Sequence, residues 1–124
     1  MTALEHTSGL RTFIPAKDFS LSRAFYRELG ATEVEIDPKL SLFTLGQSQF
    51  YLQDAYQKVW AENTMLFLFV PDLDLLWKEL QELKLDQRYP GVRLKGPTDY
   101  PWGLREIHLI EPAGGLWHFA VSLG

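Results

Sequence analysis

The sequence contains no cysteine, which excludes disulfide bonds, thiolate nucleophiles and cysteine-ligated metals. No apolar run approaches the ~20 residues that a membrane-spanning helix requires, and no signal-peptide pattern opens the chain. Lysine and arginine are dispersed among acidic residues without a basic run, which argues against nucleic acid as a partner. We therefore expect a cytoplasmic protein that binds neither membranes nor nucleic acid.

Signatures of nucleophilic or phosphate chemistry are also missing. There is no Gly-x-Ser-x-Gly elbow and no phosphate-binding loop, and the segment 95–98 (KGPT) is predicted to be a turn. The 124 residues are sufficient for a single domain spanning 1–124, and the net charge of −4 favours a cationic ligand. We therefore expect no catalytic residues and no cofactor.

The same order of elements is predicted in both halves of the chain. Apolar spacing and turn residues in the first half predict a strand at 10–15, a helix ending at Gly30, and strands at 32–36, 40–45 and 49–53. A polar linker at 54–63 follows. The second half repeats the pattern with a strand at 65–70, a helical stripe over 73–83, a long loop at 87–101 holding a short strand at 92–94, and a closing hairpin.

Two aspartates mark equivalent corners of this repeat. Asp18 and Asp72 are 72 − 18 = 54 residues apart, and each precedes a helix with apolar residues at matching offsets. The sequence therefore predicts an α+β fold of two βαβββ modules, at about 10–54 and about 63–122. A βαβββ unit covers only one face of its sheet with its helix. We expect the two units to form a curved mixed sheet with helices on the convex face and a concave cleft, which is the kind of site that ligands prefer.

The closing hairpin carries the most informative pattern. Residues 105–110 and 116–121 alternate between apolar and polar side chains, and the turn between them (EPAGG) contains a proline and two glycines. This spacing predicts a hairpin with one apolar face and one face that presents Glu106, His108 and His118.

Residues 101–119 (PWGLREIHLIEPAGGLWHF) resemble the closing hairpin of the bleomycin-resistance proteins, a branch of the vicinal oxygen chelate superfamily that includes glyoxalase I. That branch shows Trp-Gly, then Arg-Glu, then Asp-Pro-x-Gly-Asn, and here Glu111 and Gly115 replace the Asp and the Asn. Residues 63–70 (NTMLFLFV) with Leu73-Asp74 are similar to a second pattern of the same family. The resemblance extends from about 12 to 122 and implies the fold predicted above.

Enzymes of this superfamily hold a divalent metal with His, Gln or Glu side chains from the first and last strand of each module. The corresponding positions here are Arg11, Tyr51 with Gln53 nearby, Met65 and His118. Only His118 is a good ligand in that set. Glu106 and His108 form a possible set with His118, but three ligands from one hairpin rarely converge on a point. We therefore predict no metal, and interpret His118 as a hydrogen-bonded histidine on the cleft floor.

Aromatic side chains are the alternative means of holding a ligand. Met65, Phe67 and Phe69 share one face of their strand, which the 54-residue shift places in the cleft; a dimer interface or plain core is the alternative for these two phenylalanines. In the family, the residue matching Trp102 stacks on flat rings of the drug; a loop-anchoring role is its alternative. The predicted ligand-binding residues are Trp102, Phe67, Phe69, Phe43, Trp60, Glu106, His108, His118 and Arg11.

The sequence thus predicts a non-catalytic protein that sequesters a flat aromatic, cationic small molecule in a cleft at a homodimer interface, as the resemblance implies. A metal-dependent lyase or dioxygenase of the same fold is the alternative. A binding protein for a metabolite unrelated to antibiotics also fits the same residues, because a fold does not settle a function.

Overall fold

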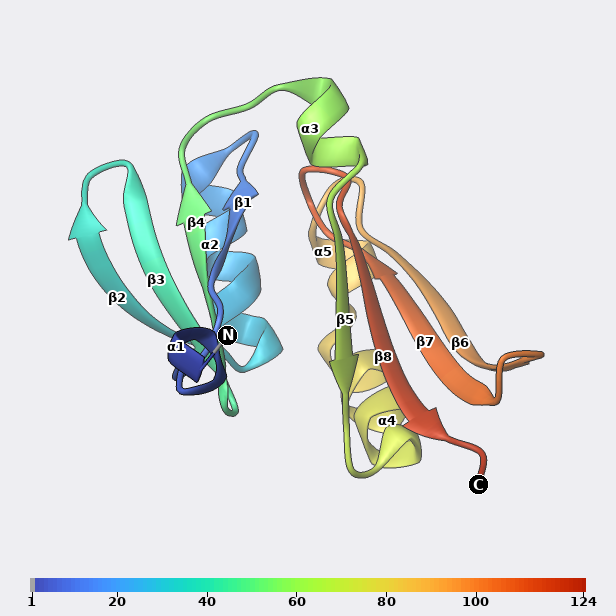
Figure 1. The fold of residues 1–124 in the computed structure, drawn as a ribbon. Coiled ribbons are helices and arrows are strands. Elements are labelled where there is room, and N and C mark those ends of the chain that lie inside the picture. The colour runs from blue at the N-terminus through green and yellow to red at the C-terminus, as the bar shows by residue number, and fades with distance from the viewer. Residues whose placement is uncertain (1) are drawn as a thin grey trace.

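The computed structural model describes residues 2–124, and its strands form two four-stranded sheets (Figure 1). The first module comprises β1 (Thr12–Pro15), α2 (Phe19–Leu29), β2 (Thr32–Asp37), β3 (Leu40–Leu45) and β4 (Ser48–Gln53). The second comprises β5 (Met65–Phe69), α4 (Leu73–Leu83), α5 (Leu85–Arg88), β6 (Arg93–Tyr100), β7 (Leu104–Ile110) and β8 (Leu116–Ser122). Two short helices precede the modules, α1 (Thr2–Glu5) before the first and α3 (Lys58–Glu62) before the second. The predicted α+β fold with two βαβββ modules is confirmed.

The sheets have equivalent strand orders. In the first sheet β1 pairs in parallel with β4, and β3 and β2 follow antiparallel; in the second sheet β5, β8, β7 and β6 repeat this order. The edge strands β1 and β5 do not pair with each other among the described residues, so the expected single curved sheet is instead two sheets. None of the helices in residues 2–124 has the length and apolar character needed to cross a membrane.

The two main helices begin where the sequence predicts. The side chain of Asp18 accepts a hydrogen bond from the backbone N–H of Leu21 at 3.1 Å, and that of Asp72 accepts one from Leu75 at 3.0 Å. Gly30 ends α2 with a φ of 114°, a left-handed conformation that favours glycine. These local signals fix both ends of α2 and the start of α4 without help from the rest of the chain.

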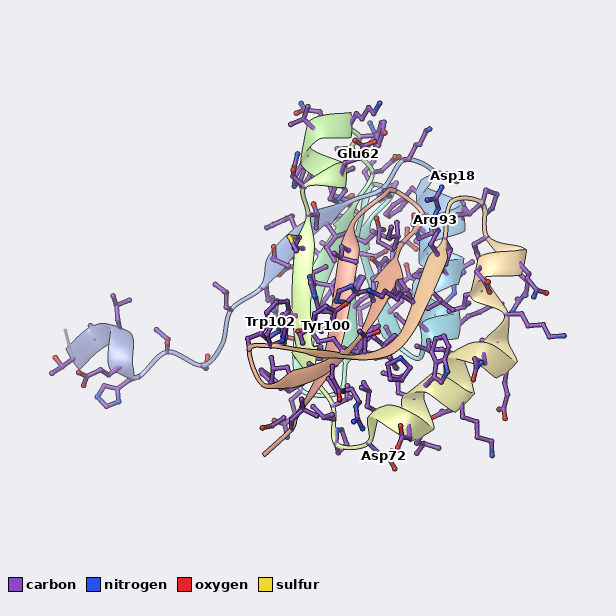
Figure 2. All side chains as sticks on the ribbon, turned by 90° about the vertical axis from the view of Figure 1, so that its right-hand side faces the viewer. Asp18, Glu62, Asp72, Arg93, Tyr100 and Trp102 are labelled. Carbon is purple, nitrogen blue, oxygen red and sulfur yellow. The ribbon has the colours of Figure 1, made fainter. Side chains whose placement is uncertain are left out.

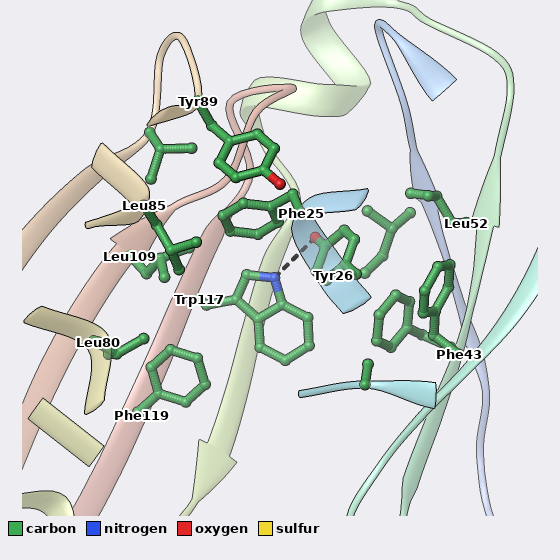
Figure 3. Close-up of a cluster of buried hydrophobic side chains, with 14 of the residues drawn as sticks. Phe25, Tyr26, Phe43, Leu52, Leu80, Leu85, Tyr89, Leu109, Trp117 and Phe119 are labelled. Carbon is green, nitrogen blue, oxygen red and sulfur yellow. Dashed lines mark hydrogen bonds between the residues drawn. The ribbon is translucent and has the colours of Figure 1, made fainter. Parts of the chain in front are cut away.

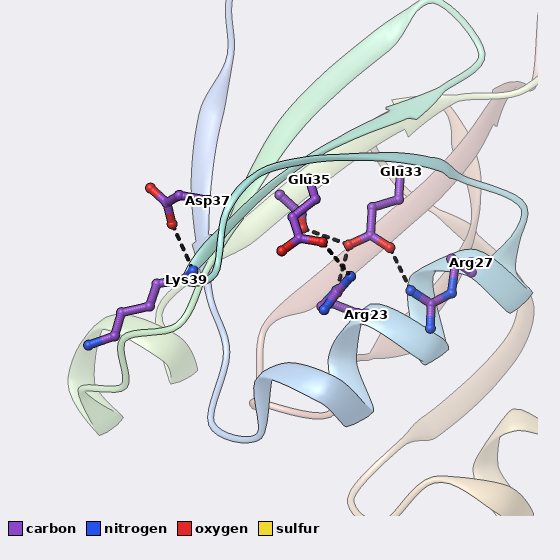
Figure 4. Close-up of polar contacts among 7 residues, drawn as sticks. Arg23, Arg27, Glu33, Glu35, Asp37 and Lys39 are labelled. Atoms are coloured by element: carbon purple, nitrogen blue, oxygen red, sulfur yellow. Dashed lines mark hydrogen bonds and ion pairs between the residues drawn. The ribbon is translucent and has the colours of Figure 1, made fainter.

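An ionic cluster attaches β2 to the helix that precedes it (Figure 4). The carboxylate of Glu33 accepts hydrogen bonds from Arg23 at 2.5 Å, from Arg27 at 2.5 Å and from Ser41 at 2.6 Å. Burial acts to raise the pKa of Glu33, but these three donors outweigh it and hold the pKa below its usual value. The cluster therefore fixes an edge strand that contributes few residues to the core.

One core joins the two modules through the helix-covered faces of both sheets (Figure 3). Tyr26 of α2 packs its ring 4.9 Å from Phe50 of β4 and 6.1 Å from Trp117 of β8, measured between centroids. Its hydroxyl accepts a hydrogen bond of 3.0 Å from the Trp117 indole. Because side chains alternate across a strand, the uncovered face of each sheet points away from this shared core. This packing accounts for the two separate sheets.

The segment 87–101 differs from the sequence-based expectation. It was predicted to be a loop with a short strand at 92–94, but Arg93–Tyr100 form the edge strand β6. Gly96 and Pro97 lie in an irregularity of the pairing with β7, between Lys95 and Thr98, and not in a turn. A Cβ atom on Gly96 would lie 3.1 Å from the Trp77 ring, so glycine lets α4 approach the strand closely. The strand places Tyr100 beside the predicted site.

Candidate functional site

The uncovered face of the second sheet brings together most of the predicted site residues. The strand registers align Lys95 with His108, His108 with His118, and His118 with Phe67, so these four residues form one row across the sheet. The neighbouring row contains Glu106 and, two strands away, Phe69. The alternation read from the sequence therefore placed these side chains on a common face.

A buried carboxylate lies at the centre of this face. Glu106 is 1% exposed, and its Oε1 lies 2.8 Å from Nε2 of His108 and 3.0 Å from Nδ1 of His118. Its Oε2 accepts a hydrogen bond of 2.7 Å from the indole N–H of Trp102. Burial acts to raise the pKa of Glu106, yet the donors outweigh this effect and keep the pKa below its usual value. Since an ionised carboxylate only accepts, both histidine nitrogens that face it carry protons.

The rings around Glu106 stack into a run that we call the aromatic ladder: Trp102, Tyr100, His108, His118, Phe67 and Phe69. Trp102 stacks on Tyr100 with centroids 4.6 Å apart and planes 10° apart, and Tyr100 stacks on His108 at 5.4 Å. His108 meets His118 edge to face at 4.6 Å, and His118 stacks on Phe67 at 5.2 Å. The hydrogen bonds to one carboxylate thus orient three members of the ladder (Figure 2 labels Tyr100 and Trp102).

The outer members of the ladder are open to solvent. Phe67, Phe69 and Trp102 are 47%, 64% and 61% exposed, although each is a large apolar ring. Phe67 and Phe69 also border an apolar cavity of about 690 Å³, which lies where β5 approaches the β3–β4 turn and Leu29. Clustered exposed rings of this kind are typical of a binding surface and not of a sheet face that meets only water.

The first sheet carries a related but different arrangement at equivalent positions. Phe13 stacks on Tyr51 at 4.8 Å; the 54-residue shift makes Phe13 the counterpart of Phe67, and each pairs in register with a residue of the parallel neighbouring strand, Tyr51 of β4 or His118 of β8. Arg11, the counterpart of Met65, donates to the hydroxyl of Tyr51 at 2.7 Å and to Gln49 Oε1 at 3.0 Å. This face therefore presents a guanidinium and a phenol where the second face presents a thioether and an imidazole.

Three sequence-based assignments need comment. Phe43 was predicted as a ligand-stacking residue, but it is fully buried and stacks on Phe50 at 5.5 Å in the core, so that assignment is wrong. Trp60 lies half-buried in α3 and is not part of the aromatic ladder. A surface ion pair with Arg105 or Arg11 is the alternative for Glu106, but Arg105 binds Asp99 at 2.6 Å and Arg11 donates to Gln49 and Tyr51. Tyr100 was missed because it lay in the predicted loop.

The hairpin does converge three potential metal ligands, contrary to the expectation that one hairpin rarely does so. One ligand atom each from Glu106, His108 and His118 lie within 4.8 Å of one another, the only such group of three in residues 2–124. Two imidazoles and a carboxylate suit zinc and similar ions. The same atoms, however, satisfy one another through hydrogen bonds, so a bound ion would have to displace both histidine N–H groups from Glu106.

Solved structures of bleomycin-binding proteins share this fold. No protein-family model and no curated protein matches the sequence. The bleomycin resistance determinant encoded on transposon Tn5 superposes with a TM-score of 0.80 at 20% identity, covering 94% of this chain and 98% of its own. The bleomycin-binding protein from Streptomyces verticillus, complexed with copper(II)-bleomycin, gives 0.73 at 21% identity, covering 91% and 94%.

A lactoylglutathione lyase from Agrobacterium tumefaciens also matches, with a TM-score of 0.68 at 17% identity and 92% of both chains covered. The chain therefore has the fold of bleomycin-resistance and glyoxalase proteins, and the resemblance expected from its closing hairpin is confirmed at the level of the fold.

Proposed function

We propose that this protein binds and sequesters a flat aromatic small molecule on the aromatic ladder, without chemical conversion. The observation that carries the proposal is the run of stacked rings, exposed at its ends and held from beneath by the buried carboxylate of Glu106. Stacking of a ligand ring on an aromatic side chain contributes on the order of 1–3 kcal/mol. Several rings in one surface therefore give useful affinity for a planar ligand.

The ladder is well suited to binding because three of its members are already oriented. Trp102, His108 and His118 each form a hydrogen bond with Glu106, so little side-chain freedom remains for a ligand to remove. Ordering a mobile side chain at an interface costs about 0.5–1.5 kcal/mol, and this cost is avoided here.

We further propose that a second copy of the chain completes the site as a homodimer. Each module leaves one sheet face uncovered, with Phe13 exposed on the first and Phe67 and Phe69 on the second. A two-fold arrangement that sets the first face of one copy against the second face of the other would close two equivalent clefts. The N-terminal segment supports such exchange, since α1 projects from the body of the chain (Figure 2) and Leu10 is 92% exposed.

The fold relatives support sequestration. One is described as a bleomycin resistance determinant and another as a bleomycin-binding protein in complex with copper(II)-bleomycin. Binding a toxic compound without altering it is a sufficient means of protection. This function requires rings and a cleft but no nucleophile.

The test is titration of tryptophan fluorescence with bleomycin and with simpler planar heteroaromatics, using the wild type and W102F. Quenching that saturates at micromolar concentrations in the wild type, and shifts to higher concentration in W102F, is expected. W60F is the matched control, because Trp60 lies outside the ladder. Absence of quenching by every planar ligand at tens of micromolar would refute the proposal.

A metal-dependent lyase or dioxygenase is the second candidate, favoured by the convergence of Glu106, His108 and His118. Elemental analysis of protein purified without chelators distinguishes the two. Stoichiometric zinc, nickel, manganese or iron that is lost in H118A would favour the enzyme, whereas substoichiometric metal would favour binding alone.

A further inference from the structure

The charges on the uncovered face of the second sheet are opposite in sign to the charge of the whole chain. The chain has a net charge of −4, yet the exposed charged side chains on this face are Arg93 and Lys95 of β6. The negative charge of Glu106 is 1% exposed and is satisfied by three N–H donors beneath the rings. A ligand on the aromatic ladder therefore meets positive charge at the β6 side.

Most arginines of the molecule form ion pairs with carboxylates, and Arg93 is an exception, which supports a role for it in ligand binding. Within residues 2–124, Arg23, Arg27, Arg88 and Arg105 each form an ion pair with a carboxylate. The other two arginines, Arg11 and Arg93, form no ion pair with a carboxylate among these residues, and each lies beside an uncovered sheet face. The guanidinium charges are thus paired with carboxylates elsewhere and left without a counter-charge on the two uncovered faces, where Arg11 donates only to neutral groups.

The geometry places both cations on β6, the strand that edges this face of the sheet. Arg93 and Lys95 are two residues apart on one strand, so their side chains leave the same face about 7 Å apart. Lys95 lies in register with His108 and Arg93 with Ile110. A depression of about 270 Å³ lies between them, lined by Arg93, Leu94, Lys95, His108, Ile110 and Leu116.

Lys95 is also connected directly to the ladder. Its Nζ donates to the hydroxyl of Tyr100 at 3.2 Å and lies 5.5 Å from the centre of that ring. The ammonium group is therefore held beside Tyr100, the ring that stacks on the exposed Trp102. Arg93 complements it, since a guanidinium binds the two oxygens of a carboxylate side by side.

Resting on the proposed function, we propose that the ligand is an aromatic anion, a planar ring system with an oxyanion substituent such as a carboxylate, and that Arg93 and Lys95 bind this substituent. The assignment reverses the cationic ligand expected from net charge. Net charge sums over the whole surface, whereas a bound group responds to the charges within about one Debye length, ~8–10 Å.

Three probes of one shape and different charge test the assignment: 2-naphthoate, 2-naphthamide and 2-naphthylmethylammonium, each titrated calorimetrically into the full-length protein. We expect naphthoate to bind about 10-fold more tightly than the neutral amide, as one charge-assisted contact would give, and the ammonium probe to bind most weakly. Raising the salt concentration should weaken naphthoate binding and leave the amide unchanged.

The double variant R93Q/K95Q should abolish the advantage of naphthoate and leave amide affinity within about 2-fold of the wild type. K39Q/K78Q is the matched control, because it removes the same number of charges from exposed lysines away from the face. Charged residues on an edge strand also prevent pairing with other chains, and that role alone predicts no change in ligand preference.

The outcomes separate this inference from the proposed function. If the amide or the ammonium probe binds as tightly as naphthoate, the aromatic anion is refuted while the binding function stands. If naphthoate keeps its advantage in R93Q/K95Q, the assignment to these two residues is wrong. If none of the three probes binds, the aromatic ladder is not a ligand site and both proposals fail.

Discussion

Replacing Glu111 by glutamine should change how the stability of this protein depends on pH. Glu111 lies in the β7–β8 turn, is 1% exposed, and accepts hydrogen bonds at Oε1 from the backbone N–H groups of Gly115 at 2.6 Å and Ala113 at 3.1 Å. Its Oε2 accepts one from Tyr26 of the other module at 3.2 Å. Burial raises the pKa of Glu111 to about 7, and these donors only partly oppose the shift.

The sign and size of the pH effect on the free energy of unfolding follow from proton linkage. Between the ordinary pKa of 4.5 and the folded value of about 7, the folded chain holds a proton on Glu111 that the unfolded chain has released. The stabilisation is therefore fully present below pH 4.5 and is lost as the pH rises through 7. A shift of this size corresponds to about 3 kcal/mol of unfolding free energy.

Urea unfolding, followed by tryptophan fluorescence at several pH values from 5 to 8, measures this effect at one fixed protein concentration. The E111Q side chain can still accept from both backbone N–H groups but carries no charge at any pH. Between pH 5 and pH 8, we expect the free energy of unfolding of E111Q to rise by about 3 kcal/mol relative to that of the wild type. E111Q should then be the more stable protein at pH 8. Other titrating groups are common to both proteins and cancel in the difference. Parallel stability curves would show that Glu111 titrates normally and would refute the reasoning.

Other substitutions test the remaining features. D72A removes the cap of α4 and should cost about 1 kcal/mol by thermal or urea unfolding. D74A, which removes an acidic side chain from the first turn of the same helix and leaves the Asp72 cap intact, should cost less. W102A should weaken binding of a planar ligand about 10-fold in a fluorescence or calorimetric titration, with little change in melting temperature because Trp102 is largely exposed. F43A should do the reverse, destabilising the fold by about 3–5 kcal/mol while leaving the ladder in place. A large loss of stability in W102A with none in F43A would contradict both assignments.

Local and periodic signals in the sequence were sufficient for much of this structure. Asp18 and Asp72 cap helices because a short acidic side chain before an apolar stripe satisfies the first unpaired N–H groups, and this depends on neighbours alone. The alternation in 105–110 likewise placed Glu106 and His108 on one face, since the period of a strand is fixed.

Features that depend on distant contacts were not accessible in the same way. Gly96 and Pro97 are typical turn residues, and only the close approach of Trp77 and the irregular pairing with β7 show why they lie within a strand. Phe43 occupies a strand position that periodicity leaves ambiguous, and it is the packing with Tyr26 and Phe50 that makes it core. The convergence of His108 and His118 on one carboxylate oxygen is likewise a matter of side-chain rotamers across two strands.

The equivalent pairing of β1 with β4 and of β5 with β8 gives positions on one uncovered face a twin on the other. The twins Phe13 and Phe67 are still identical, whereas Arg11 stands opposite Met65, and Tyr51 opposite His118. At these twins the two faces present different chemical groups to a ligand. Grafting the side chains of one half onto the other would therefore show which differences separate two specialised surfaces from a simple duplicate.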